Sequence, residues 1–196
     1  MANIIDIQTV DVSTISPDEI FAIDTNVLFW THYSKASDPA LIKSNKNRYQ
    51  VKEYPDFIAK LLQNGNKLVT TMLNITELFG VVERNEYNIY KIVNNQKISK
   101  KDFRKLSSER SKYKSEIDNM VLQIQTSYDN QIKILDVDEK LVSSFQGNIC
   151  SNTCDVFDYA VIEYLKRNKI FNYISDDKDF AGIEGISLYT TYGSNK

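Results

Sequence analysis

Residues 20–26 of the chain are Ile-Phe-Ala-Ile-Asp-Thr-Asn, a short apolar run that ends at Asp24. Such a run is typical of a parallel strand that is buried on both faces. Residues 74–79, 155–160 and 173–180 also carry acidic side chains next to apolar segments. In open α/β folds the carboxyl ends of the strands meet at one edge of the sheet, where active sites lie. We therefore expect these acidic side chains to converge there.

The order of predicted elements indicates an α/β fold. Strands are expected at 4–7 (an edge strand), 20–23, 67–71, 132–135, 171–175 and 186–189. Helices are expected near 56–62, 74–93, 99–128 (one helix or two), 138–145, and from Asp155 or Asp158 to 166. Alternating strands and helices imply a three-layer α/β/α sandwich around a mainly parallel central sheet. Because no linker or repeat interrupts the pattern, we assign 1–19 to an N-terminal extension and 20–196 to a single domain.

The composition is that of a globular protein, with 42% apolar and 26% charged residues among 196. Asp6 and Asp11 interrupt the apolar N-terminal residues, so no signal peptide is evident. No apolar run reaches the ~20 residues that a membrane-spanning helix needs. We therefore expect a cytoplasmic location. Cys150 and Cys154, with His32 as the single histidine, are too few ligands for a zinc site, and we interpret them as ordinary thiols.

The segment from Lys91 to Glu116 is strongly basic, although the chain as a whole has a formal net charge of −2. It holds nine Lys and Arg against three acids, 9 − 3 = +6, so the remainder carries −2 − 6 = −8. A basic segment beside an acidic body suits a phosphate backbone, whereas a solvated helix face is the simpler alternative. We assign 91–130 to a helical, basic elaboration. Its candidate nucleic-acid contacts are Lys97, Lys100, Lys101, Arg104 and Lys105.

Two interpretations stand for each of the first two acidic positions. Asp24 is either a turn or helix cap, or a metal ligand at a strand end that Asn26 orients. Glu77 follows Asn74 by three residues, which is the spacing of a capping box. Because it also lies one helical turn beyond a strand end, its side chain can lean back over the sheet edge.

The remaining acids form two groups. Asp155 and Asp158 are three residues apart and share one helix face, where one of them can serve as the cap. Asp176, Asp177 and Asp179 crowd a single turn, which is more acid than a cap requires. Two unit charges 4 Å apart repel by roughly 4 kcal/mol at an effective dielectric near 20, so converging carboxylates call for a cation. Oxygen ligands favour Mg²⁺ or Mn²⁺.

These motifs resemble those of PIN-domain nucleases over most of the chain, from Phe21 to about Thr191. Ile23-Asp24-Thr25-Asn26 resembles the opening strand end of that family, and Thr70-Thr71 through Glu77 resembles its strand followed by a helix that bears a Glu. The helix start at Asp158 and the segment 173–180 resemble the family's two closing motifs. The resemblance implies a catalytic and metal-binding quartet. This quartet is Asp24, Glu77, Asp158 and Asp177, with Asp155, Asp176 and Asp179 as accessory ligands.

The resemblance implies an endoribonuclease that depends on Mg²⁺ or Mn²⁺. It further implies the toxin of a toxin–antitoxin pair, with RNA as substrate, an antitoxin protein as partner and a homodimer as a possible assembly. The alternative is a PIN-like RNA-binding or adaptor module of weak activity, which acts through the basic segment. A phosphatase is disfavoured because Asp24-Thr25-Asn26 lacks the second Asp of an aspartyl-nucleophile motif. Motifs of P-loop, dinucleotide-binding and serine-hydrolase proteins are absent.

Overall fold

The computed structural model describes residues 1–36, 49–126, 132–139 and 154–192 of the chain. Within these residues six strands form one sheet, and all neighbouring strands are parallel. The strands are β1 (Asn3–Asp6), β2 (Ile20–Ile23), β3 (Lys67–Thr71), β4 (Ile132–Leu135), β5 (Asn172–Ile174) and β6 (Ser187–Thr190). Their order across the sheet is β1-β6-β5-β2-β3-β4. The predicted parallel sheet is therefore confirmed.

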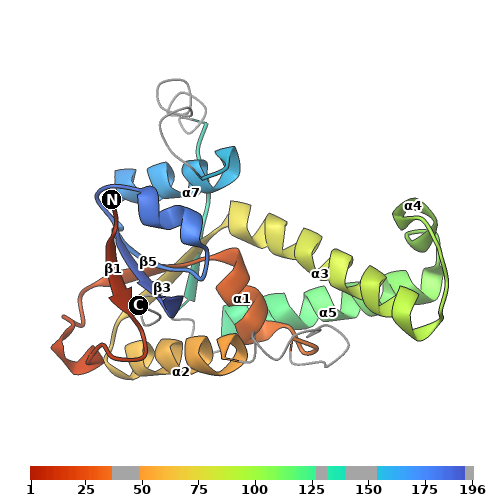
Figure 1. Cartoon of the computed structure of the whole chain (residues 1–196), viewed down its shortest axis with the longest axis horizontal. Helices are drawn as coiled ribbons and strands as arrows, with labels where there is room; N and C mark the ends of the chain where they lie inside the picture. The colour runs from red at the N-terminus through yellow and green to blue at the C-terminus, as the bar shows by residue number, and fades with distance from the viewer. Residues whose placement is uncertain (37–48, 127–131, 140–153, 193–196) are drawn as a thin grey trace.

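Helices cover both faces of this sheet, with α7 on one side and α2 on the other (Figure 1). The described helices are α1 (Thr25–His32), α2 (Gln50–Gln63), α3 (Met72–Val93), α4 (Lys100–Phe103), α5 (Ser107–Thr126) and α7 (Val156–Arg167). Two 3-10 turns are also described, η1 (Val12–Thr14) between β1 and β2, and η5 (Lys178–Gly182) between β5 and β6. The fold is a three-layer α/β/α sandwich. No helix in the described ranges is long and apolar enough to cross a membrane.

Strand β2 shows how the sequence produces the layers. Because successive side chains of a strand point to opposite faces, Phe21 and Ile23 pack in the core that α1 and α2 share. Ala22, between them, packs in the second core under α7. Each of the three is at most 1% exposed. Burying a side chain the size of Phe21 or Ile23 contributes about 1.5–3 kcal/mol. A charged residue at position 23 would therefore break the central strand.

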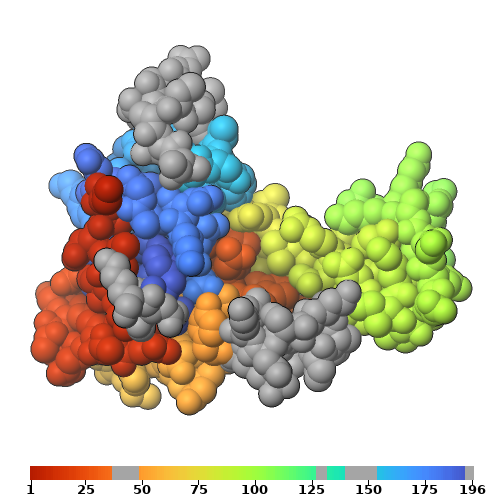
Figure 2. Space-filling model, in the orientation of Figure 1, coloured from red at the N-terminus to blue at the C-terminus, as the bar shows by residue number. Residues whose placement is uncertain are grey.

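Helices α3 and α5 leave the sheet and form an arm that projects from the main body (Figure 2). With 22 residues, α3 is roughly 33 Å long, and α5 runs alongside it (Figure 1). The short α4 closes the far end, where Phe103 is buried against the rings of Tyr87 and Tyr90, both with centroids 5.5 Å away. The arm thus has a small core of its own, and the basic segment surrounds it.

Several boundaries differ from the sequence-based expectation. No element was expected at 25–32, where the structure has helix α1. Helix α3 begins at Met72 rather than Asn74, since Thr71 is its N-cap. Strand β1 pairs with β6, so residues within 1–19 extend the main sheet. Most of the helix expected at 138–145 lies outside the described residues, as does Cys150; Cys154 is a buried free thiol.

Candidate active site at the carboxyl edge of the sheet

The carboxyl ends of β2, β3 and β5 bring the predicted acids to one edge of the sheet. Asp24 directly follows β2, and Asp176 and Asp177 lie just beyond β5. Glu77 stands in the second turn of α3, which starts where β3 ends. Since β2 lies between β3 and β5, these three groups are neighbours in space as the parallel order requires.

Asp24 is the most enclosed of the acids, only 3% exposed. Its Oδ1 accepts hydrogen bonds from the Thr25 N–H (2.8 Å) and the Tyr173 hydroxyl (3.1 Å), and its Oδ2 accepts one from the Ser175 hydroxyl (2.7 Å). Burial raises the pKa of this carboxyl to about 6; the Ser175 bond opposes that shift, whereas the negative charge of Glu77 adds to it. Asp24 also caps α1, which confirms the cap interpretation, whereas the metal-ligand interpretation stays a prediction.

Glu77 is positioned by a contact with the start of α1. Its Oε2 accepts a hydrogen bond from the Thr25 hydroxyl at 2.5 Å. The capping-box interpretation of Asn74 and Glu77 is wrong, because the helix cap is the Thr71 hydroxyl, which accepts from the Asn74 N–H (3.2 Å). The Asn74 side-chain amide donates to the Thr25 hydroxyl oxygen at 3.1 Å. Glu77 therefore has no capping duty and faces the group of acids.

Of Asp155 and Asp158, which share one helix face, Asp155 is the helix cap, and the ligand role of Asp158 stays a prediction. Asp155 caps α7 and accepts from the N–H groups of Phe157 (2.8 Å) and Asp158 (2.9 Å). Within the described residues the Asp158 carboxylate accepts no hydrogen bond. Burial raises its pKa to about 8, and the negative charges of the surrounding acids add to that shift. In decreasing order of effect these acids are Asp24, Asp155, Glu77 and Asp177.

The three acids after β5 have different surroundings. Asp176 is held by α2 and the end of β6: its carboxylate accepts from Tyr54 (2.8 Å), Thr191 (3.0 Å), Tyr49 (3.3 Å) and the Gln50 amide. Asp177 caps η5 through the Asp179 N–H (2.9 Å) and also acts on the pKa of Asp158. Asp179 is exposed. Of the three, Asp177 has the position that best suits a shared ligand.

The residues that orient Asp24 were not found from the sequence. Asn26 was expected to do so, yet it is exposed, and no bond from it to Asp24 occurs among the described residues. Thr25, Tyr173 and Ser175 orient the carboxylate instead. Thr25 could have been suspected because it follows Asp24 directly. Tyr173 on β5 and Ser175 just beyond it lack any local signal, since their contact with Asp24 depends on β5 pairing with β2.

No three Asp, Glu, His or Cys side chains of the described residues already stand as a group that could hold a metal ion. Several of the acids are instead engaged by protein donors. The donor set still fits a hard divalent cation, because it consists of carboxylate oxygens. Burial raises the pKa values of two of them, and the negative charges of the neighbouring acids add to that shift. The residues that would hold such an ion are Asp24, Asp158 and Asp177, with Glu77 beside them.

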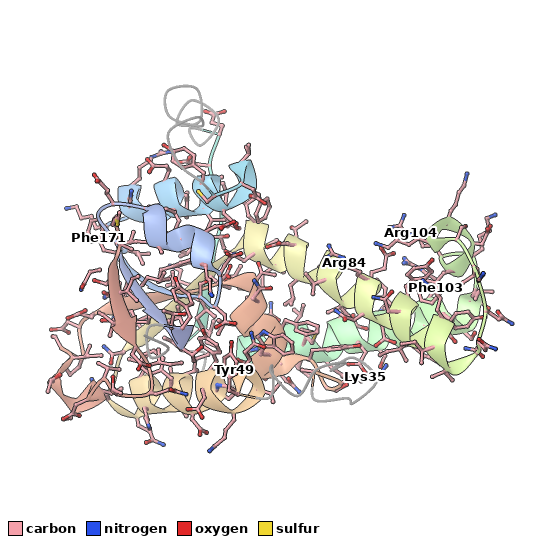
Figure 3. The ribbon with its side chains drawn as sticks, in the orientation of Figure 1. Lys35, Tyr49, Arg84, Phe103, Arg104 and Phe171 are labelled. Atoms are coloured by element: carbon pink, nitrogen blue, oxygen red, sulfur yellow. The ribbon has the colours of Figure 1, made fainter. Side chains whose placement is uncertain are left out.

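In the arm, by contrast, a buried acidic side chain has cationic partners. Glu83 on α3 is buried and accepts two bonds from the Arg104 guanidinium, Nε to Oε1 at 2.7 Å and Nη2 to Oε2 at 2.6 Å. Lys100 (3.2 Å) and Arg110 (3.7 Å) add ion pairs to the same carboxylate. The Arg104 bonds are the main reason why the pKa of Glu83 falls to about 2. Figure 3 shows Arg104 next to Phe103 at the end of the arm.

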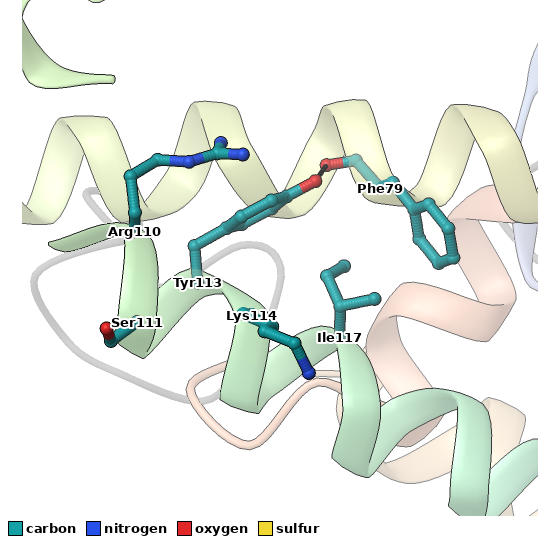
Figure 4. A pocket seen from close by; sticks show the side chains of 6 residues that line it. All are labelled: Phe79, Arg110, Ser111, Tyr113, Lys114 and Ile117. Atoms are coloured by element: carbon teal, nitrogen blue, oxygen red, sulfur yellow. Dashed lines mark hydrogen bonds between the residues drawn. The ribbon is translucent and has the colours of Figure 1, made fainter. Parts of the chain in front are cut away.

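Other bases of this segment also have intramolecular partners. Lys105 pairs with Asp102 and Lys112 with Glu109, both at 2.7 Å. Near Glu83, Arg110 lies over the Tyr113 ring, whose hydroxyl donates to the Phe79 carbonyl at 3.1 Å (Figure 4). Lys97 and Lys101 are exposed and have no ion pair within the described ranges. The nucleic-acid contacts assigned to this segment stay a prediction, now weighted toward these two lysines.

Comparison with known proteins gives similarity at the level of structure. No family model matches the sequence, and no curated protein sequence matches it. Among solved structures the chain is similar to a chain of VapBC2 from Rickettsia felis, determined bound to a DNA fragment from their promoter. The identity is 13%, the TM-score is 0.49, and the match covers 87% of this chain and 98% of the other. A likeness at this level does not bear on activity, substrate or partner.

Proposed function

We propose that this protein is an endoribonuclease that depends on Mg²⁺ or Mn²⁺. The observation that supports the proposal is Asp158, a carboxylate with no described hydrogen-bond donor that four other carboxylates repel. A cation bound among them would offset that repulsion. Repulsion among carboxylates at the carboxyl edge of a parallel sheet lowers the free energy of unfolding, and a bound cation removes that cost.

When bound, the metal would activate a water molecule and stabilise the negative charge that develops on the phosphodiester. The chain's own contribution is positioning. Ser175 and Tyr173 hold the Asp24 carboxylate, Thr25 holds Glu77, and the Asp155 cap fixes the first turn of α7 and with it Asp158. Glu77, which lies near the rim, would orient a water molecule.

The direct test is cleavage of single-stranded RNA by purified protein, with Mn²⁺, with Mg²⁺ and with a chelator. We expect cleavage that requires the metal and is lost in Asp24→Asn. Asp179→Asn is the matched control, because Asp179 is exposed and outside the central group. Metal-independent cleavage, or full activity of Asp24→Asn, would contradict the proposal.

The toxin role and an antitoxin partner rest on the resemblance of the motifs to PIN domains. If the role is right, induced expression of the wild-type chain arrests growth of a bacterial host, and Asp24→Asn, produced to the same level, does not. Equal arrest by both chains would separate toxicity from the acidic site.

A binding or adaptor module is the second candidate. One observation favours it: Asp24 already has three protein donors, so its charge is partly satisfied without a metal. Such a module would bind RNA through Lys97 and Lys101 with equal affinity in the presence of Mn²⁺ and of a chelator, and would cleave nothing.

A further inference from the structure

A cavity of about 460 Å³ lies beside the acidic group, in the size range of small-molecule sites. It is lined by Asn26 and Trp30 of α1, Gln50 of α2, and Asp176, Asp177 and Lys178 beyond β5. Asn26 and Trp30 are four residues apart, so they lie on the same face of α1. Asp177 belongs both to this cavity and to the proposed metal site. A substrate bound at one would therefore extend into the other.

Gln50 is the feature of this cavity that the fold alone does not explain. Its side chain is 7% exposed, and its Nε2 donates to the Asp176 carboxylate. That bond fixes the amide orientation, because Oε1 facing the same carboxylate would be repelled. Oε1 is left buried with no hydrogen-bond partner among the described residues. A buried acceptor without a donor is uncommon and costly, and a ligand donor would relieve the cost.

Trp30 supplies the second feature. It is the single tryptophan of the chain and is only partly buried, although its neighbour Phe29 is 5% exposed. An indole beside hydrogen-bonding groups is the kind of surface on which unpaired nucleobases stack. The Asn26 amide is exposed at the same face, and the Lys178 ammonium balances part of the acidic lining.

We propose that this cavity is a nucleobase subsite that selects bases with an exocyclic amino group. The base stacks on Trp30, and the Gln50 side chain turns so that Oε1, buried in the ligand-free chain, accepts an amino N–H of the base. Adenine, cytosine and guanine carry such a group, whereas uracil has a carbonyl oxygen where cytosine has its amino group and is disfavoured. The subsite rests on the proposed nuclease function for its biological use and would set the base preference next to the cleaved bond.

The test uses the fluorescence of Trp30 in the metal-free full-length chain, so it requires no catalysis. Adenosine, cytidine and uridine are the probes, since neutral nucleosides avoid repulsion by Asp177. We expect adenosine and cytidine to quench the emission, with uridine binding roughly tenfold more weakly for lack of the hydrogen bond. Equal affinity for all three nucleosides, or no quenching by any, would overturn the proposal.

Two variants separate a direct contact of Gln50 from an indirect one. Gln50→Met keeps the side-chain length and removes the acceptor, and we expect it to equalise the three affinities. Tyr49→Phe removes another donor to the same Asp176 oxygen, outside the cavity lining. We expect it to keep the preference. If both variants abolish the preference, Gln50 acts only through Asp176 and the proposal fails. A chain that shows the preference yet cleaves no RNA would retain this subsite and refute the nuclease.

Discussion

The acidic site and the helical arm bury negative charge in opposite ways. In the arm each buried glutamate has a cationic partner: Glu83 has three, Glu86 pairs with Lys35 at 2.6 Å, and Glu109 pairs with Lys112. At the sheet edge the acids are surrounded by hydroxyls, N–H groups and one another. Cationic partners accordingly lower the pKa of Glu83 in the arm, whereas burial raises the pKa values of Asp24 and Asp158 at the edge.

This contrast separates charge that stabilises the fold from charge that, under the proposed function, is retained for a metal ion. The paired acids in the arm hold α3, α4 and α5 together. Most of the basic residues that suggested a nucleic-acid surface form ion pairs with acidic residues of the arm. Unpaired acids at the sheet edge cost stability. Each prediction below asks whether one region can be changed without the other.

The largest expected effect is on catalysis. We expect Asp24→Asn to lower the rate of RNA cleavage by roughly 10²–10³-fold, the range that the loss of a single electrostatic contact typically gives. Because the asparagine removes a repelled charge, the free energy of unfolding should stay equal or rise. Chemical denaturation alongside the cleavage assay measures both. An unfolded variant would mean that Asp24 acts as a cap alone.

Metal should stabilise the wild-type chain and leave the variant unchanged. A ligand at one hundred times its dissociation constant adds about 2.7 kcal/mol when it binds only the folded state. For a chain of this size that corresponds to a rise in melting temperature of about 5–10 °C. A thermal melt with and without Mn²⁺ gives the answer. Equal rises in wild type and Asp24→Asn would place the metal elsewhere.

The converse change is made in the arm. We expect Glu83→Gln to lower the free energy of unfolding by about 1–2 kcal/mol, between the values for buried and surface ion pairs, because Lys100 and Arg104 are about half exposed. Glu109→Gln, which loses a single partner, is the matched control and should cost less. Cleavage per folded molecule should be unaffected by either. Loss of activity in folded Glu83→Gln would couple the two regions.

The pH dependence of metal-free stability should differ in sign between the regions. The pKa of Asp24 rises from 3.8 to about 6, and that of Asp158 from 3.8 to about 8, so the folded state holds more protons than the unfolded state. These groups therefore lower stability progressively as pH rises from about 4 to 8. Glu83, whose pKa falls from 4.5 to about 2, gives stability above pH 4.5 that is lost as pH falls toward 2.

The contribution of Asp24 to the pH dependence of stability is obtained by comparing wild type with Asp24→Asn. The stability of wild type minus that of Asp24→Asn, measured by denaturation at a series of pH values with a chelator present, should fall between about pH 4 and 6. A flat difference would show that the Asp24 carboxyl titrates at its ordinary pKa and is not strained by its surroundings.

The smallest expected effect concerns Lys97 and Lys101, which have no ion pair among the described residues. Reversal of Lys97 and Lys101 to Glu should weaken RNA binding and reduce the salt slope by about one for each phosphate that is no longer neutralised. Folding should be unaffected, since both side chains are exposed. Lys105→Glu, which changes a base already paired with Asp102, is the comparison variant. Equal effects at all three positions would restore the whole segment to the interface.

The sequence predicts the sheet well and the side-chain network poorly, for physical reasons. The apolar run 20–23 is buried on both faces, so its composition identifies it, and 67–71 is marked by the β-branched residues Val69, Thr70 and Thr71. The edge that collects the acids follows from parallel pairing. The hydrogen bonds from Tyr173 and Ser175 to Asp24 join residues about 150 positions apart, so no local sequence pattern predicts them. Glu83 likewise lies outside the basic segment and meets Arg104 only after the chain reverses.

Strand β1 has a consequence for the order in which the chain becomes functional during synthesis. Its partner is β6, so Asn3 lies opposite Ser187, and no other described strand lies beside it. β1 emerges early from the ribosome, yet it cannot pair with β6 until residues near 190 have emerged. The donors that hold Asp24, and Asp177 itself, arrive in the same late portion. A nascent chain is therefore without its acidic site until residues near 190 have emerged from the ribosome, and the proposed nuclease activity cannot begin before that point.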